Sequence, residues 1–427
     1  MIKPQEERVV VTGYGCLTAV GHNFTDTWAA ITSGQTGISQ ITQWDVTGWE
    51  HPLGAEIKNY DPKALIADRK LLKLLSRHDV IGLNAVAQAL AHSQLLPYRD
   101  SLSEPTLFND RSGVYVGSPG THYHQQYDFH PLLSYAQGDM NRFAAGLFEQ
   151  VHPMWLLRIL PNNVLAYTGI QYQFKGANEN VTNHAVSGMQ AIAEACHALK
   201  QGTIDRAIVV GYESGVEPQG QIYYGSLGAL SSTGLRSFDQ KRSGTILAEG
   251  AGAIVLETLS AAKERGAVIY GEILAAATTN EAMGVFPLRE DADGLKRVLI
   301  NGLAKAKLEP DAIGMLTAHG NGTYNSDTTE AIAINKIFTP DSIPVTGFKW
   351  SLGHTLTAAG VLETILTLQC LRQGQLPGIA SLKTLAHDCA GLRVSHKPQS
   401  VRSPVGVVVT RGFASVNSCL VVSSEIE

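Results

Sequence analysis

The sequence predicts an α/β protein with a doubled core. With 427 residues, the chain suits two packed halves of about 200 residues each better than one minimal domain. Apolar stretches that run into glycine alternate with amphipathic stretches, as strands and helices alternate in layered α/β folds. This alternation starts again after a charged segment at 260–265. We therefore expect an N-terminal half at 1–260 and a C-terminal half at 261–427.

Each half is expected to contain strands and helices in turn. In the first half, the pattern predicts strands at 9–15, 113–117, 179–182, 207–211 and 250–256, and helices at 25–33, 70–93 and 189–200. In the second half, it predicts strands at 268–277, 312–317, 343–348, 405–410 and 418–423, and helices at 293–306, 328–338 and 358–371. The segment 119–161 is rich in Tyr, His, Phe and Gln, and we interpret it as a cap or an interface.

The composition argues against several classes of function. A net charge of −5 with 17% charged residues gives no basic stripe, so nucleic acid is not an expected partner. The five cysteines are scattered singly, so we expect no metal site and no disulfide framework, and a cytoplasmic location suits them. The N-terminus is polar and no apolar run reaches about 18 residues, which argues against secretion and membrane insertion.

The turn Asn-His-Ala-Val-Ser-Gly at 183–188 is the centre of the predicted site. It lies between the extended stretch at 179–182 and the helix at 189–200. A strand that ends sharply before a helix beginning with Ser-Gly presents one side chain and several backbone amides to a common point, as a nucleophile elbow does. Ala185 stands at that centre. The turn therefore has the geometry of covalent catalysis without the atom that would attack.

Two later segments carry histidines at turns. His319 leaves a predicted strand into a Gly-Asn-Gly loop, and Asp327 and Glu330 follow where carboxylates can fix that loop. On this stretch alone, His319 could also be a structural histidine bonded to backbone. Lys349 and His354 lie five residues apart across a turn that contains glycine. Taken alone, Lys349 could equally be a solvated charge at the end of a strand.

Four separated motifs occur in a fixed order along the chain. The last of them, the small-residue loop at 411–417, would by itself be a tight β connection with Phe413 in the core. The matching segments are the elbow at 183–188, Ala-His-Gly-Asn-Gly-Thr at 318–323 with Asp327 and Glu330, Lys-Trp-Ser-Leu-Gly-His at 349–354 with Ala-Ala-Gly at 358–360, and Gly-Phe at 412–413 with Asn417, supported by 9–21, 236–239 and 248–252. In this order, from about residue 8 to 423, the chain resembles the elongating β-ketoacyl-[acyl carrier protein] synthases.

The resemblance implies a thiolase-like fold, with two similar halves in a five-layered α-β-α-β-α arrangement and usually a dimer. It implies an acyltransferase reaction, the decarboxylative Claisen condensation of malonyl-carrier protein with an acyl thioester, in fatty-acid or polyketide-type elongation. The acyl carrier protein would be the partner, and its phosphopantetheine would carry the substrates, so no separate cofactor is implied. The second subunit would be an identical chain or a related synthase.

Residue roles follow motif by motif. Ala185 stands at the position of the family's nucleophilic cysteine, and His319 and His354 match the two histidines that assist decarboxylation. Lys349 matches the neighbouring lysine, and Glu330 is the carboxylate expected to support it. Imidazole N–H groups aimed at the enolate would each stabilise it by roughly 2.7 to 4 kcal/mol.

The remaining matched residues concern substrate entry. Phe413 matches the gate beside the elbow, and its backbone amide is expected to form the oxyanion hole with that of Ala185. Thr323 and Asn321 are expected substrate-binding residues, although Asn321 replaces a threonine expected to bind the pantetheine arm. Phe148 and Trp155, from the insertion, are expected to line the acyl tunnel and the dimer contact.

Ala185 is the main departure from the family pattern, because a methyl group cannot form a thioester. Cys196 cannot replace the cysteine, since eleven helical residues span about 16 Å at about 1.5 Å per residue. Three explanations stay open: a laboratory Cys→Ala change, a natural non-condensing subunit akin to chain-length factors, or a malonyl-carrier protein decarboxylase. Asn183-His184 and Arg411 with Ala414-Ser415 also depart from the pattern, which favours natural divergence, whereas the retained histidines favour catalysis.

A thiolase that degrades β-ketoacyl-coenzyme A is a further alternative. Such an enzyme would need a reactive cysteine in the loop near Phe413. Cys419 instead falls inside the last predicted strand, which makes this the weaker interpretation.

Overall fold

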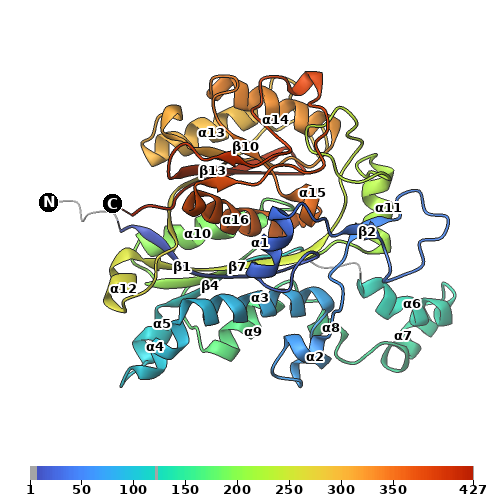
Figure 1. The fold of residues 1–427 in the computed structure, drawn as a ribbon. Helices are drawn as coiled ribbons and strands as arrows, with labels where there is room; N and C mark the ends of the chain where they lie inside the picture. Colours follow the sequence, from blue (N-terminus) through green and yellow to red (C-terminus); the bar gives the residue numbers. More distant parts are fainter. Residues whose placement is uncertain (1–6, 121–123, 427) are drawn as a thin grey trace.

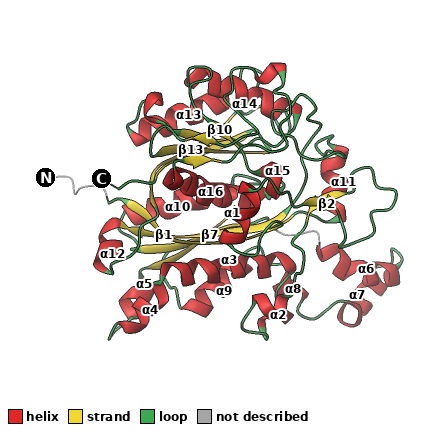
Figure 2. Ribbon diagram, viewed as in Figure 1, coloured by secondary structure: helices red, strands yellow, loops and turns green. Residues whose placement is uncertain are grey.

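The computed structural model describes residues 7–120 and 124–426, with backbone alone for 124–128. Ten of the described strands form one continuous sheet whose two halves lie in two layers and repeat one pairing scheme (Figure 2). The first layer has the order β1 (Val9–Thr18), β7 (Glu249–Thr258), β6 (Arg206–Ser214), β4 (Ser112–Gly117) and β5 (Asn178–Val181). The second has the order β8 (Gly271–Asn280), β14 (Val416–Ser423), β13 (Val405–Gly412), β9 (Met315–Thr317) and β10 (Val345–Thr346).

The two layers are equivalent strand by strand. In each, the first three strands pair antiparallel and the last three pair parallel. The layers meet where β1 pairs with β8 through Val10–Glu272 and Val11–Gly271. The doubled core expected from the repeated alternation is therefore confirmed.

Helices fill the space between the layers and cover both outer faces (Figure 1). The central layer holds α10 (Ser187–Lys200) and α16 (Ala359–Gln373), α3 (Arg77–Ser93) and α9 (Asn163–Tyr172) cover the first sheet, and α13 (Asp293–Ala306) and α14 (Tyr324–Ile337) cover the second. Nearly every residue of α16 is buried, as expected for a helix with a sheet on each side. This is the five-layered arrangement, and the expected fold class is confirmed.

The remaining elements are short or peripheral. They are α1 (Phe24–Thr32), β2 (Ile38–Gln40), β3 (Leu53–Ala55), α2 (Pro62–Leu65), α4 (Leu95–Ser101), α5 (Thr106–Asp110), α11 (Pro218–Ser226), α12 (Leu259–Glu264), α15 (Lys349–Leu352), β11 (Gln375–Leu376) and β12 (Gln399–Ser400). No helix in the described ranges is long and apolar enough to cross a bilayer.

Several expected elements have other bounds in the structure; the strand expected at 343–348, for example, is only Val345–Thr346. The helix expected at 70–93 begins only at Arg77, because Ser76 and Asp79 form a reciprocal capping box that starts it there. Lys349 does not end a strand but opens the one-turn helix α15, and it is buried rather than solvated.

The insertion at 119–161 lies at the periphery. It contains α6 (His124–Ala136), α7 (Met140–Gln150) and α8 (Trp155–Arg158), which extend to one side of the layered body (Figure 1). Phe129 contacts Trp155 at a ring distance of 4.8 Å, whereas Phe148 is 91% exposed. The insertion is thus a small helical unit with its own aromatic contacts.

Candidate active site

The elbow forms as the sequence predicts. After β5 ends, His184 adopts a left-handed conformation (φ 51°), and α10 begins at Ser187. The Ser187 hydroxyl donates to the His184 carbonyl (2.7 Å) and accepts from the Asn183 amide (2.7 Å), which holds the turn. Gly188 is required here, because a Cβ would lie 2.5 Å from the Thr357 carbonyl oxygen.

Two buried carboxylates hold the His319 loop. Glu330 accepts from the amides of His319 (2.7 Å) and Gly320 (2.9 Å). Asp327 accepts from the amides of Gly322 (3.1 Å) and Phe238 (2.7 Å), and burial raises its pKa to about 7. The expectation that these carboxylates fix the loop is confirmed by these contacts.

The expected pairing of Lys349 with Glu330 is wrong. The Lys349 ammonium lies 2.5 Å from the carboxylate of Glu363, on α16, and both side chains are buried. The carboxylate of Glu330 is already engaged by the loop amides, which leaves Glu363 as the partner of the lysine. Burial raises the pKa of Glu363 to about 7, although the Lys349 ammonium acts in the opposite direction.

His319 and His354 lie together, with ring centroids 5.1 Å apart and the rings edge to face. Nδ1 of His319 accepts from the Arg411 amide (3.3 Å), and Nδ1 of His354 accepts from the Leu356 amide (3.3 Å). An accepting nitrogen carries no hydrogen, so each neutral ring carries its proton on Nε2. Burial, followed by the Lys349 ammonium, holds the pKa of both imidazoles well below its ordinary value.

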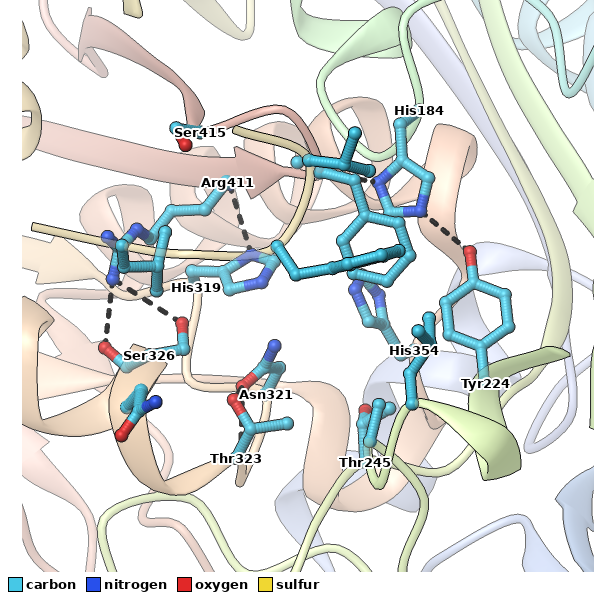
Figure 3. Close-up of a pocket in the computed structure, with 18 of the residues that line it drawn as sticks. His184, Tyr224, Thr245, His319, Asn321, Thr323, Ser326, His354, Arg411 and Ser415 are labelled. Carbon is cyan, nitrogen blue, oxygen red and sulfur yellow. Dashed lines mark hydrogen bonds between the residues drawn. The ribbon is translucent and has the colours of Figure 1, made fainter. Parts of the chain in front are cut away.

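Both histidines line one cavity of about 320 Å³, which we call the histidine cavity. Figure 3 shows the imidazoles of His184, His319 and His354 around this space. Asn321, Thr323 and Phe413 also line it. The expected convergence therefore occurs for His319, His354 and Phe413. The expected place of Phe148 and Trp155 on an acyl tunnel and a dimer contact stays a prediction, and neither residue lines the histidine cavity.

Ala185 itself is fully buried and is not among the residues that line the histidine cavity. Its neighbour His184 lines the cavity instead. Nδ1 of His184 accepts from the Phe413 amide (3.2 Å), and Nε2–H donates to the Tyr224 hydroxyl (2.6 Å). Burial lowers the pKa of His184 to about 4, so the ring stays a neutral acceptor.

The Phe413 amide is therefore not open to a thioester, and its expected role in an oxyanion hole is wrong for this conformation. Sequence reasoning treated His184 only as a departure from a small residue. The available signal was its size, because an imidazole in place of a small residue needs room beside the nucleophile position.

The loop after β13 is fastened on several sides. The buried Arg411 guanidinium donates to the Ser326 carbonyl (2.9 Å), the Thr329 hydroxyl (2.8 Å) and the Asn417 side chain (2.9 Å). Ala414 and Ser415 follow in left-handed conformations (φ 61° and 58°). The departures at these positions thus anchor the Phe413 loop, and the backbone amide of Arg411 also contacts His319.

Two models of known protein-family domains match most of the chain. The model of the beta-ketoacyl synthase N-terminal domain matches residues 6–262, and that of the C-terminal domain matches residues 270–383. The chain belongs to the beta-ketoacyl synthase family. Members of this family are acyltransferases of the 3-oxoacyl-[acyl-carrier-protein] synthase type that act in chain elongation.

A 3-oxoacyl-[acyl-carrier-protein] synthase 2 of Coxiella burnetii is 28% identical over 98% of this chain and 99% of its own length. The ishigamide ketosynthase/chain length factor superposes with a TM-score of 0.86 at 25% identity, covering 99% of this chain and 100% of that one. A type II PKS ketosynthase in complex with its acyl-carrier protein gives a TM-score of 0.82 at 23% identity, covering 99% and 100%.

This beta-ketoacyl synthase family protein offers no thiol to its cavity. The five cysteines are buried and none lines the histidine cavity. Burial raises the pKa of Cys196 to about 12, so it is not a nucleophile at neutral pH. The described residues also contain no cluster of His, Cys, Asp or Glu that could hold a metal ion.

Proposed function

We propose that this beta-ketoacyl synthase family protein binds the malonyl thioester of an acyl carrier protein and decarboxylates it without forming an acyl-enzyme. The observation that carries the proposal is the pair of neutral imidazoles at the histidine cavity. Both Nδ1 atoms accept from backbone amides, so both Nε2–H groups are available to a ligand.

The chemistry needs only hydrogen-bond donors. The bond between Cα of the malonyl group and its carboxylate breaks, CO2 leaves, and the electron pair forms an enolate on the thioester oxygen. His319 and His354, both buried, donate from Nε2 to that oxygen as negative charge develops. A water proton then adds to Cα and gives the acetyl thioester.

Condensation would require a further group. Its first step transfers an acyl chain to a side-chain nucleophile, and Ala185 supplies none. The proposed reaction therefore stops at the acetyl thioester, which remains on the carrier.

Two cavity residues are candidates for holding the pantetheine arm. Thr323 donates from its amide (3.0 Å) and from its hydroxyl (2.8 Å) to the Asn321 side-chain oxygen, which orders both residues at the cavity. The Thr323 oxygen can still accept, and the Asn321 amide group can donate, as an amide-rich arm requires. An acyl carrier protein is accordingly the proposed partner, consistent with the complex described for the type II PKS ketosynthase.

The test incubates the purified protein with malonyl-carrier protein and follows the carrier by intact-mass spectrometry. We expect acetyl-carrier protein to form faster than in a reaction without enzyme, with no mass added to the enzyme. The exposed His197, on α10, provides a matched control, and His197→Ala should leave the rate unchanged. A rate equal to that of malonyl-carrier protein alone would eliminate the decarboxylase function.

A second candidate is a non-condensing half of a heterodimer, favoured by Ala185 and by the likeness to the ishigamide ketosynthase/chain length factor. In this role, the protein would shape the substrate tunnel of a partner that bears the cysteine. Co-expression with a cysteine-bearing relative from the same genome, followed by size-exclusion chromatography, distinguishes the two candidates. A mixed dimer whose activity survives loss of His319 supports the subunit role.

A further inference from the structure

A second cavity, of about 260 Å³, adjoins the histidine cavity. It is lined by the end of β6, by α11 and by the turn at 356–357. Three residues, His184, Tyr224 and Phe413, line both cavities. They therefore stand between the two spaces, and we call them the aromatic wall.

The aromatic wall is packed and hydrogen-bonded. The His184 and Phe413 rings stack at 4.2 Å, and the Tyr224 and Phe413 rings lie 5.3 Å apart. His184 links the other two residues, because Nδ1 accepts from the Phe413 amide and Nε2–H donates to the Tyr224 hydroxyl. The imidazole is thus the member that joins the wall together.

The second cavity has a mixed lining, with apolar residues such as Leu356 and Tyr223 and with buried carboxylates. The buried side chains of Glu213 and Glu217 line it, together with Ser214 and Thr357. Apolar surface gains free energy by contact with other apolar surface, and carboxylates do not provide it. An acyl chain that passed the wall would therefore meet two buried carboxylates as well as apolar side chains.

We infer that His184 is the specificity-determining residue of this site: it closes the histidine cavity toward position 185 and confines it to short carrier-bound acyl groups. Its ring engages the amide that would stabilise an acyl-transfer oxyanion, and it lines the cavity where Ala185 does not. The wall thus excludes acyl transfer independently of the missing thiol.

This inference rests on the proposed use of the histidine cavity by carrier-bound thioesters, and its test uses a different readout. Ala185→Cys restores a thiol, and the double variant His184→Gly with Ala185→Cys also removes the imidazole. Glycine is chosen because position 184 has a φ of 51°, which glycine adopts without strain. Each variant is incubated with hexanoyl-carrier protein, and the enzyme is followed by intact-mass spectrometry.

In the reaction under test, the introduced thiolate attacks the thioester carbonyl, the carbon–sulfur bond to the carrier breaks, and the carrier thiol leaves with a proton from solvent. We expect the double variant to acquire the hexanoyl mass about 100-fold faster than Ala185→Cys alone, the effect of one recovered oxyanion donor. His184→Ala with Ala185→Cys is tested in parallel, in case the glycine variant does not fold. His197→Ala with Ala185→Cys is the matched control and should behave like Ala185→Cys.

Equal acylation of the single and double variants, including none in either, would overturn the inference. The proposed function fails separately, because it requires acetyl-carrier protein from the unmodified protein. If the unmodified protein shows no decarboxylation, but acylation appears only when His184 is removed, the inference about the aromatic wall holds and the proposed decarboxylation is wrong.

Discussion

The ammonium of Lys349 and the carboxylate of Glu363 form an ion pair, 2.5 Å apart, between a one-turn helix and the central helix α16. Both side chains are about 2% exposed. The Lys349 charge in turn contributes to lowering the pKa of His319 and His354. The carboxylate on α16 therefore holds the lysine charge that acts on the two imidazoles of the histidine cavity.

Breaking this pair should destabilise the protein. Glu363→Gln leaves the lysine charge buried, and we expect the free energy of unfolding to fall by about 3 to 5 kcal/mol. Replacing both partners, in Lys349→Met with Glu363→Met, should recover most of that loss. Denaturant unfolding measures each value. The exposed Arg289–Asp291 pair is the control, since Arg289→Gln should cost less than about 1 kcal/mol.

Loss of Glu330 should affect the His319 loop rather than Lys349. Glu330→Ala removes the acceptor for the amides of His319 and Gly320, and we expect a cost of about 1 to 3 kcal/mol in unfolding free energy. Decarboxylation should slow as well, because His319 is no longer held. Glu290→Ala, at an exposed position, serves as the control. If the changes in unfolding free energy of Glu330→Ala and Lys349→Met add in the double variant, the two residues have separate roles. Strong coupling between the two changes would instead indicate that Glu330 pairs with Lys349.

Each cavity histidine should contribute separately to decarboxylation. His319→Ala and His354→Ala should each lower the rate by about 10² to 10³, because each removes one donor to the enolate. Acetyl-carrier protein formation under single-turnover conditions measures the chemical step. Unchanged rates in both variants, with stability retained, would remove the imidazole pair from the mechanism.

The rate should respond little to acid between about pH 6 and about pH 5. An ordinary imidazole with a pKa near 6.5 would be almost fully protonated at the lower end and could no longer accept at Nδ1. Because the pKa of His319 and of His354 is lowered, the neutral form persists to lower pH. Asp327 and Glu363, whose pKa burial raises to about 7, titrate above this window. A tenfold loss of rate across it would contradict the assignment of neutral imidazoles.

The elbow should not tolerate a larger residue at Gly188. A methyl group there would meet the Thr357 carbonyl oxygen at 2.5 Å and Cγ2 of Val361 at 3.0 Å. We expect Gly188→Ala to destabilise the protein by about 1 to 3 kcal/mol through overpacking. In contrast, Gly169→Ala, in α9, meets its nearest neighbour at 3.4 Å and should be neutral or stabilising. Thermal unfolding of the two variants provides the comparison.

Much of the site was predictable because its motifs are local. The His319 loop follows a strand, its carboxylates follow at the next helix, and the elbow requires only a strand end before a helix. Assignments that depended on a partner from a distant segment were less reliable. Glu330 and Glu363 are both carboxylates on helices after the histidine turns, and nothing in their spacing from Lys349 shows which one the lysine reaches. The motif similarly placed the Phe413 amide in the oxyanion hole. In the structure this amide donates to His184, which lies far away in the chain.

The amino-acid sequence by itself determined the doubled α/β fold, the family and the absence of a nucleophile at position 185, because these depend on periodicity, motif order and residue type. Only the tertiary structure decided which carboxylate pairs with Lys349, which ring nitrogens carry hydrogen, and that His184 stands between two cavities. The physical reason is that hydrogen bonds and ion pairs form between whichever groups the packed layers bring within about 3 Å, and sequence separation does not encode that distance.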